Sequence, residues 1–143
     1  MINKAILVGN LGADPDIGET QRGARFCTRS VATSRKWTDK QSGERKEKTT
    51  WHRVVIWGDA IANECGKRLR KGSKVFVEGE IEHRKYTDKM SVERWATEIV
   101  VQGFNGRVVF CDGSGGQPGA GGAATPPPPD EPEGWRDVAM MGG

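Results

Sequence analysis

Aromatic and basic side chains alternate with aliphatic ones in the segment 51–57, a pattern that predicts a β-strand. Because successive side chains of a strand point to opposite faces, one face carries two rings, a cation and a valine, namely Trp51, Arg53, Val55 and Trp57. The other face carries His52, Val54 and Ile56. An aliphatic face suits a protein core, so we expect the face with the tryptophans to point outward. The alternative is that these tryptophans cover a second small core or a subunit interface.

Two further rings stand beside cations. Trp37 opens the charged stretch WTDKQSGERKEKT, which we expect to be a loop and which contains Lys40, and Tyr86 follows Arg84 and Lys85 at the start of a second polar loop. A base stacked on an aromatic side chain contributes about 1–3 kcal/mol with any base sequence, and a basic groove follows the phosphates. Duplex DNA hides its base faces, so the pattern predicts binding of single strands.

Charge is distributed unevenly along the chain. Residues 1–111 hold 21 basic and 14 acidic residues, a net charge of +7, whereas residues 112–143 hold one and five, a net charge of −4. A basic body favours a polyanionic partner. The second segment is rich in Gly and Pro and has few apolar residues, so it cannot bury enough surface to order itself. We therefore predict a folded domain over 1–111 and a disordered acidic tail over 112–143.

The elements that must position these rings are short apolar runs bounded by polar residues and glycine, which predict five short strands at 4–9, 26–33, 51–57, 73–81 and 94–102. Apolar residues at helical spacing predict one helix over 59–72, with Asp59 as its N-cap and Gly72 just past its end. One helix between the third and fourth of five strands is the order of an OB-fold, an all-β Greek-key barrel that binds oligonucleotides and oligosaccharides. Another small barrel, such as an SH3-like one, remains the alternative.

No enzyme class has positive support in the sequence. It lacks the GxxxxGK[ST] phosphate loop, the GxSxG elbow and the HExxH helix. Two-metal nucleases use clustered acids, but Asp14, Asp16 and Glu19 stand where a turn is expected after the first strand. Three cysteines without a CxxC pair, and two histidines without neighbouring ligands, predict no metal and no cofactor. No apolar run is long enough for a membrane span, so we expect no membrane partner and a cytoplasmic location.

Several ordered blocks resemble the bacterial and mitochondrial single-stranded-DNA-binding proteins, over about residues 2–104. The blocks are NKAILVGNLG at 3–12, DP at 14–15, ATS at 32–34, TWHRVV at 50–55, LRKGS at 69–73, VEG at 77–79, RKYTD at 84–88 and TEIVV at 97–101. The resemblance implies a homotetramer of OB-folds around which single-stranded DNA wraps. It also implies that the protein binds single-stranded DNA without sequence preference, and that it protects and organises single strands in DNA replication, recombination and repair. The resemblance implies that this takes place at the nucleoid.

The family's functional positions carry over residue by residue. Rings that stack on DNA match Trp37, Trp51, Trp57 and Tyr86, although relatives often have Phe in place of Trp57 and Trp in place of Tyr86. Cations match Lys40, Arg53, Arg70, Lys71, Arg84 and Lys85. A histidine at the family's subunit interface matches His52. These positions are the predicted DNA-binding and oligomer sites.

The tail departs from the family pattern. Bacterial members typically end in a run of aspartates closed by Ile-Pro-Phe, which recruits replication and repair proteins, whereas this sequence ends in VAMMGG. The resemblance implies replication and repair proteins as partners of the tail, although this tail lacks the family's closing residues. Two related functions stay open at this point. A primosome-type OB protein would be a dimer with fewer stacking rings, and an RNA-binding OB domain would contact 2′-hydroxyl groups.

Overall fold

The computed structural model describes residues 1–111, so the predicted tail at 112–143 lies outside the described residues. The described part is almost entirely β-sheet, with one α-helix and one short 3-10 turn. The elements in chain order are β1 (Ala5–Leu11), β2 (Asp16–Glu19), β3 (Arg25–Thr38), β4 (Arg45–Trp57), α1 (Asp59–Arg68), β5 (Lys74–Thr87), β6 (Glu93–Val101), η1 (Gly103–Asn105) and β7 (Arg107–Phe110). No helix among these residues is long and apolar enough to cross a membrane.

Five of the strands close into a barrel. β1 pairs with β3, β3 with β4, β4 with β6, β6 with β5, and β5 returns to β1. All of these pairs are antiparallel except β4 with β6, which is parallel. With α1 between the third and fourth barrel strands, this order confirms the predicted OB-fold. The four-residue strands β2 and β7, which pair along β3 and β5, were not predicted because neither is long enough to show a distinct apolar period.

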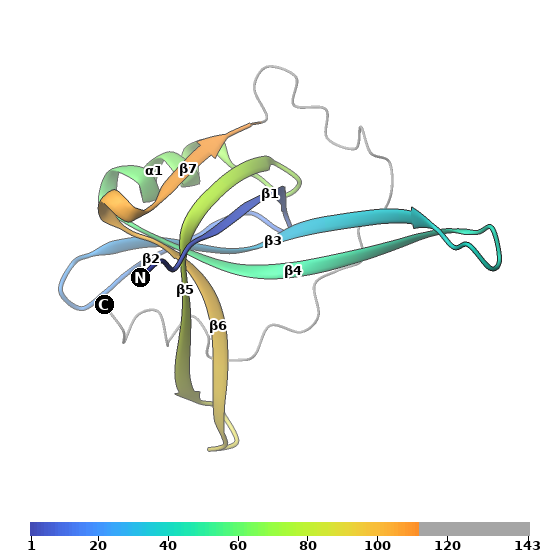
Figure 1. Cartoon of the computed structure of the whole chain (residues 1–143). Helices are drawn as coiled ribbons and strands as arrows, with labels where there is room; N and C mark the ends of the chain where they lie inside the picture. Colours follow the sequence, from blue (N-terminus) through green and yellow to red (C-terminus); the bar gives the residue numbers. More distant parts are fainter. Residues whose placement is uncertain (112–143) are drawn as a thin grey trace.

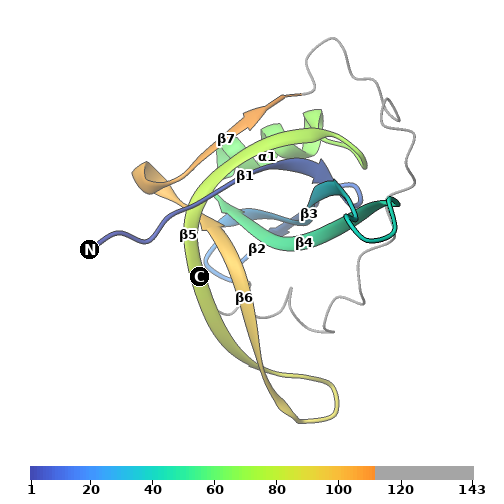
Figure 2. The same cartoon turned by 45° about the vertical axis from the view of Figure 1, so that its right-hand side comes forward.

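The prediction of short strands, and of a long loop beginning at Trp37, is wrong. The β3–β4 ladder continues past Trp37 until Thr38 pairs with Arg45, and only residues 39–44 form the turn. β5 likewise runs on to Thr87, past the predicted loop start at Tyr86. These extensions form two long ribbons, β3–β4 and β5–β6, that leave the barrel in different directions (Figures 1 and 2). The outer part of the β3–β4 ribbon is wet on both faces and has no apolar alternation, so sequence periodicity misses it.

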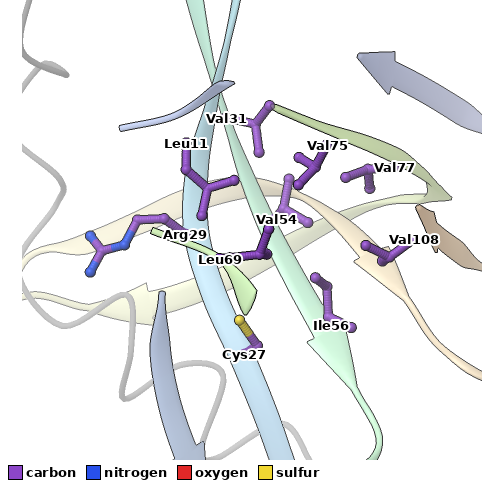
Figure 3. A pocket seen from close by; sticks show the side chains of 10 residues that line it. All are labelled: Leu11, Cys27, Arg29, Val31, Val54, Ile56, Leu69, Val75, Val77 and Val108. Carbon is purple, nitrogen blue, oxygen red and sulfur yellow. The ribbon is translucent and has the colours of Figure 1, made fainter. Parts of the chain in front are cut away.

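The core lies inside the barrel and under the helix. Its buried members are apolar: Leu11, Cys27, Val31, Val54, Ile56, Ala62, Cys65, Leu69, Val75, Val77, Ile99 and Val101. The barrel interior leaves a cavity of about 20 Å³, with room for no more than about one water molecule (Figure 3). Its lining is aliphatic apart from Cys27 and Arg29, and the Arg29 side chain points away from the cavity to pair with Asp16. This space is a packing gap and not a ligand site.

Helix α1 begins and ends differently from the sequence prediction. Gly58, with φ of 130°, is its N-cap, and Asp59 is the first helical residue. The Asp59 Oδ1 instead accepts a hydrogen bond from the backbone N–H of Arg25, 3.1 Å away. The helix stops at Arg68 because Leu69 is extended, so Gly72, with φ of +88°, belongs to the next turn. Asp59 thus joins the start of the helix to β3, and Gly72 joins the turn after the helix to β1 through the Leu11 carbonyl.

Closing the barrel depends on two glycines. A Cβ on Gly9 would lie 2.1 Å from the carbonyl oxygen of Ala32, and one on Gly79 would lie 2.5 Å from that of Val100. Both contacts are to backbone atoms, which cannot move aside without separating strands. Glycine at these positions therefore permits β1 and β5 to approach their neighbours.

Candidate nucleic-acid interface

The site is built on the side of β3, β4, β6 and β5 that faces away from the core. We call this side the outer face. Strand registers place on it Phe26, Thr28, Ser30 and Ala32 of β3, Trp51, Arg53, Val55 and Trp57 of β4, Ala96, Glu98 and Val100 of β6, and Glu80, Glu82, Arg84 and Tyr86 of β5. On β4 the alternate residues Val54 and Ile56 belong to the core. The predicted division of β4 into an aliphatic face and an aromatic, basic face is confirmed.

The outer face is less open around Trp57 than predicted. Val55 is completely buried, and Trp57 is half-buried against Phe26, with ring centroids 5.0 Å apart and planes tilted by 49°. Phe26 and Trp57 are register partners on adjacent strands, so their bulk meets on one side and shields Val55. The second small core left open as an alternative does form here. It fixes one side of the Trp57 ring and leaves the indole partly accessible.

Trp51 lies where the end of β1 meets the outer face. A Cβ on Gly12 would come within 2.5 Å of the Trp51 Cζ3 atom, so the missing side chain makes room for the indole. The neighbouring residue Leu11 accepts a hydrogen bond from the Gly72 N–H, 2.9 Å away. This contact ties the turn that carries the exposed Arg70 and Lys71 to the Trp51 end of the site. Arg70 also donates hydrogen bonds to the carbonyls at the end of α1.

Two arginines and two glutamates meet in the middle of the outer face. Arg84 Nε lies 3.5 Å from Glu98 Oε2, and an Arg84 terminal nitrogen lies 3.6 Å from Glu82 Oε2. Arg53 is the register partner of Glu98 across the parallel β4–β6 pair. Farther along β5, Tyr86 packs against Ala96 and is only 7% exposed, so little of this ring is open for stacking. Arg53, Arg84 and Tyr86 thus share one surface with the two tryptophans.

Other predicted residues lie away from this surface. Alternation places Trp37 and Lys85 on the reverse side of their ribbons. Trp37 is partly exposed, with the Arg35 guanidinium carbon 5.3 Å from its ring centroid, and Lys40 is exposed in the β3–β4 turn. The Lys85 ammonium pairs with Glu93 at 2.9 Å. Trp37 and Lys85 therefore point in a different direction from Trp51 and Trp57.

His52 lies on the reverse side of β4 from Trp51. It is half-buried, and its Nε2 atom is 2.8 Å from the Thr33 hydroxyl, within hydrogen-bond distance. Burial lowers the pKa of His52 below its ordinary value, because the charged form loses solvent. The imidazole is therefore held neutral more strongly than a free histidine.

Sequence reasoning missed three side chains of this region. Phe26 supports Trp57, Glu98 is buried between the two arginines, and Trp95 is 68% exposed on the reverse side of β6. Alternation along the segment 94–102 would have placed Glu98 on the opposite face of the strand from Trp95. Nothing local, however, shows that strands from two other parts of the chain enclose that carboxylate.

The early acidic residues have separate structural partners. Asp16 forms an ion pair with Arg29, and Asp14 accepts a hydrogen bond from the backbone N–H of Lys71, 2.8 Å away. Within residues 1–111 no group of three His, Cys, Asp or Glu residues is arranged to hold a metal ion. Asp14 thus stabilises the expected bend after β1, whereas Asp16 and Glu19 lie in β2 and not in the predicted turn.

Comparison with known proteins identifies the family. The model of the single-strand binding protein family matches residues 2–108. The chain belongs to the single-strand binding protein family. A single-stranded DNA-binding protein of Rhizobium meliloti (strain 1021) is 43% identical over 121 residues, which cover 85% of this chain and 70% of that protein. The solved Plasmodium falciparum SSB complex with ssDNA superposes with a TM-score of 0.71 at 37% identity, covering 78% of this chain and 97% of the other.

Membership of the family fixes the kind of protein. The single-strand binding proteins are binding proteins rather than enzymes, so this family member is not an enzyme. The resemblance stated from the sequence blocks is confirmed, and the match extends slightly beyond them, to residue 108.

Proposed function

We propose that this protein binds single-stranded DNA without sequence preference, and that it protects and organises single strands in DNA replication, recombination and repair. The observation that carries the proposal is the outer face, where Trp51 and Trp57 lie on the same side of β4 as Arg53. A relative of the same fold has been solved in complex with ssDNA. We also propose, from the family resemblance, that it acts in the cytoplasm, at the nucleoid.

The chemistry of the outer face suits unpaired bases. A half-buried indole offers one π-face for stacking, while arginines beside it attract the phosphates between successive bases. Phe26 already fixes the Trp57 ring at 5.0 Å, so binding need not order that side chain. Because every base has a π-face, such a surface reads no sequence. The exposed cations at 70–71 and at Lys40 and Lys85 extend the positive field beyond the rings.

Titration of intrinsic tryptophan fluorescence tests this function. The protein is titrated with oligo-dT, oligo-rU and a duplex of equal length at several salt concentrations. We expect oligo-dT to quench strongly and the duplex weakly, with the logarithm of affinity falling linearly with the logarithm of salt concentration. Equal quenching by the duplex would contradict base stacking. Tighter binding of oligo-rU than of oligo-dT would favour the RNA-binding alternative.

Assembly into a homotetramer is the second part of the proposal. Ile6 and Val8 of β1 are 58% and 48% exposed, and register places Val8 beside Phe76, which in turn pairs with Val109 of β7. An apolar strip across three strands is typical of a surface that another subunit covers. His52 is the proposed interface residue of β4. Sedimentation velocity should give a tetramer for the wild type and smaller species for Val8→Asp, whereas a monomeric wild type would refute the assembly.

Recruitment of replication and repair proteins by the acidic segment 112–143 completes the proposal. Its acidic residues near the end are Asp130, Glu131, Glu133 and Asp137. Neutralising these four to Asn or Gln in the full chain should reduce the recovery of such proteins in a pull-down on immobilised oligo-dT. Equal recovery by both proteins would show that this segment recruits nothing.

A further inference from the structure

Glu98 is the most unusual charged residue of the outer face. Its side chain is 0% exposed, and among the described residues neither carboxylate oxygen has a hydrogen-bond partner. Its close cation is Arg84, whose Nε lies 3.5 Å from Oε2. Charge-assisted hydrogen bonds in proteins are typically about 2.7–2.9 Å long, so this ion pair is loose. A buried carboxylate with only a loose partner is costly, which calls for a reason in the function of the site.

The groups around Glu98 nearly cancel one another's charge. β4 contributes Arg53, β5 contributes Arg84 and Glu82, and the next strand, β3, contributes the neutral Ser30 opposite Arg53. Burial raises the pKa of Glu98, and Glu82 raises it further, while Arg84 and Arg53 act in the opposite direction. Arg84 is shared between Glu98 and Glu82, at 3.5 Å and 3.6 Å. With both glutamates ionised, the centre of the outer face carries no net charge.

We propose that Glu98 is an internal counterion, which holds the Arg84 guanidinium in the free protein and yields it to a phosphate of single-stranded DNA on binding. This proposal rests on the proposed function. Arg84 retains 17% exposure of its side chain, so a phosphate can reach it, whereas Glu98 has no access to solvent. Once Arg84 turns to the phosphate, the buried carboxylate keeps only Arg53 as a neighbouring cation, and it takes up a proton from the solvent. Binding therefore becomes tighter as the pH falls.

Glu98→Gln is the direct test, because glutamine keeps the shape and removes the charge. We expect the affinity for oligo-dT to rise on the order of threefold or more, as Arg84 no longer has to leave an anion. The salt dependence should stay the same in log–log slope, because Arg84 neutralises the same phosphate in both complexes. Glu64→Gln is the matched control, since Glu64 is exposed on α1 and the change in net charge is the same.

Two further measurements show whether Glu98 acts through Arg84. In an Arg84→Gln background, Glu98→Gln should give no gain in affinity, because the cation for which the carboxylate and phosphate compete is absent. In a pH series from about 8 to about 5.5, the wild type should gain more affinity than Glu98→Gln. His83, which bonds to Thr97 on the reverse side of the ribbon, and His52 are present in both proteins, so the difference between the two profiles isolates Glu98.

The outcomes separate this proposal from the proposed function. Failure of the wild type to bind oligo-dT would refute the proposed function. Wild-type binding with equal affinity and an equal pH profile in Glu98→Gln would refute only the counterion role. A lower affinity of a folded Glu98→Gln protein would refute it too, since Glu98 would then position Arg84 rather than compete for it. If Glu98→Gln does not fold, equal pH profiles of the wild type and Arg84→Gln would refute the role.

Discussion

Replacing Trp57 with alanine removes a ring that has two contacts, one with the protein and one, by our proposal, with DNA. On the protein side the indole packs on Phe26 at 5.0 Å and helps to bury Val55 completely. On the other side its half-buried ring remains accessible from the outer face. The substitution should therefore lower both the stability of the fold and the affinity for single strands, and the two effects can be measured separately.

The size of each effect follows from these contacts. Truncating a fully buried tryptophan costs about 3–5 kcal/mol, and an aromatic pair contributes about 0.5–1.5 kcal/mol of its own. For a half-buried ring with one aromatic partner we expect about 2–3 kcal/mol in the free energy of unfolding. Loss of one stacked base, about 1–3 kcal/mol, corresponds to a weakening of about 5-fold to 150-fold in Kd. Trp57→Phe keeps a ring over Phe26 and should lose much less of both.

Fluorescence anisotropy of labelled oligo-dT measures the affinity, and urea denaturation measures the stability. Trp95→Ala is the matched control, because Trp95 is 68% exposed on the reverse side of β6 and is in no core cluster of the described residues. It should change stability by no more than about 0.5 kcal/mol. Affinity of folded Trp57→Ala within about twofold of the wild type, or an equal loss in Trp95→Ala, would refute the assignment of the outer face.

Three further predictions concern the barrel, a histidine and a buried ring. Gly9→Ala should lower the free energy of unfolding by about 1–3 kcal/mol, because its Cβ would meet the Ala32 carbonyl at 2.1 Å. Gly66→Ala should not lower it, because its Cβ would meet the exposed Ile17 side chain at 3.3 Å. Burial lowers the pKa of His52, so the unfolded chain binds more protons than the folded protein as the pH falls. The urea midpoint should therefore fall as the pH drops below about 6.5, and it should fall less steeply in His52→Gln. Tyr86→Ala should lose stability and affinity together, since this ring is 7% exposed, whereas Tyr86→Phe should retain both in the same assays.

The sequence by itself determined the order of the five barrel strands and the helix, and the two faces of β4. Both are local properties, since strands and helices differ in the spacing of their apolar residues and a strand alternates with a period of two. That alternation alone is enough to place Trp51, Arg53 and Trp57 on one side of the strand. It gave no signal for the polar halves of β3 and β4, because a ribbon that is wet on both faces has no apolar period.

Only the tertiary structure decided what surrounds these residues. The parallel pairing of β4 with β6 sets Arg53 opposite Glu98, and the β5–β6 pair brings Arg84 to the same carboxylate. Phe26 reaches Trp57 from β3 in the same way. The burial of Glu98 and the support of Trp57 each require side chains from strands that are distant in the sequence. Register across such strands is a property of the closed barrel, which no single segment of the chain encodes.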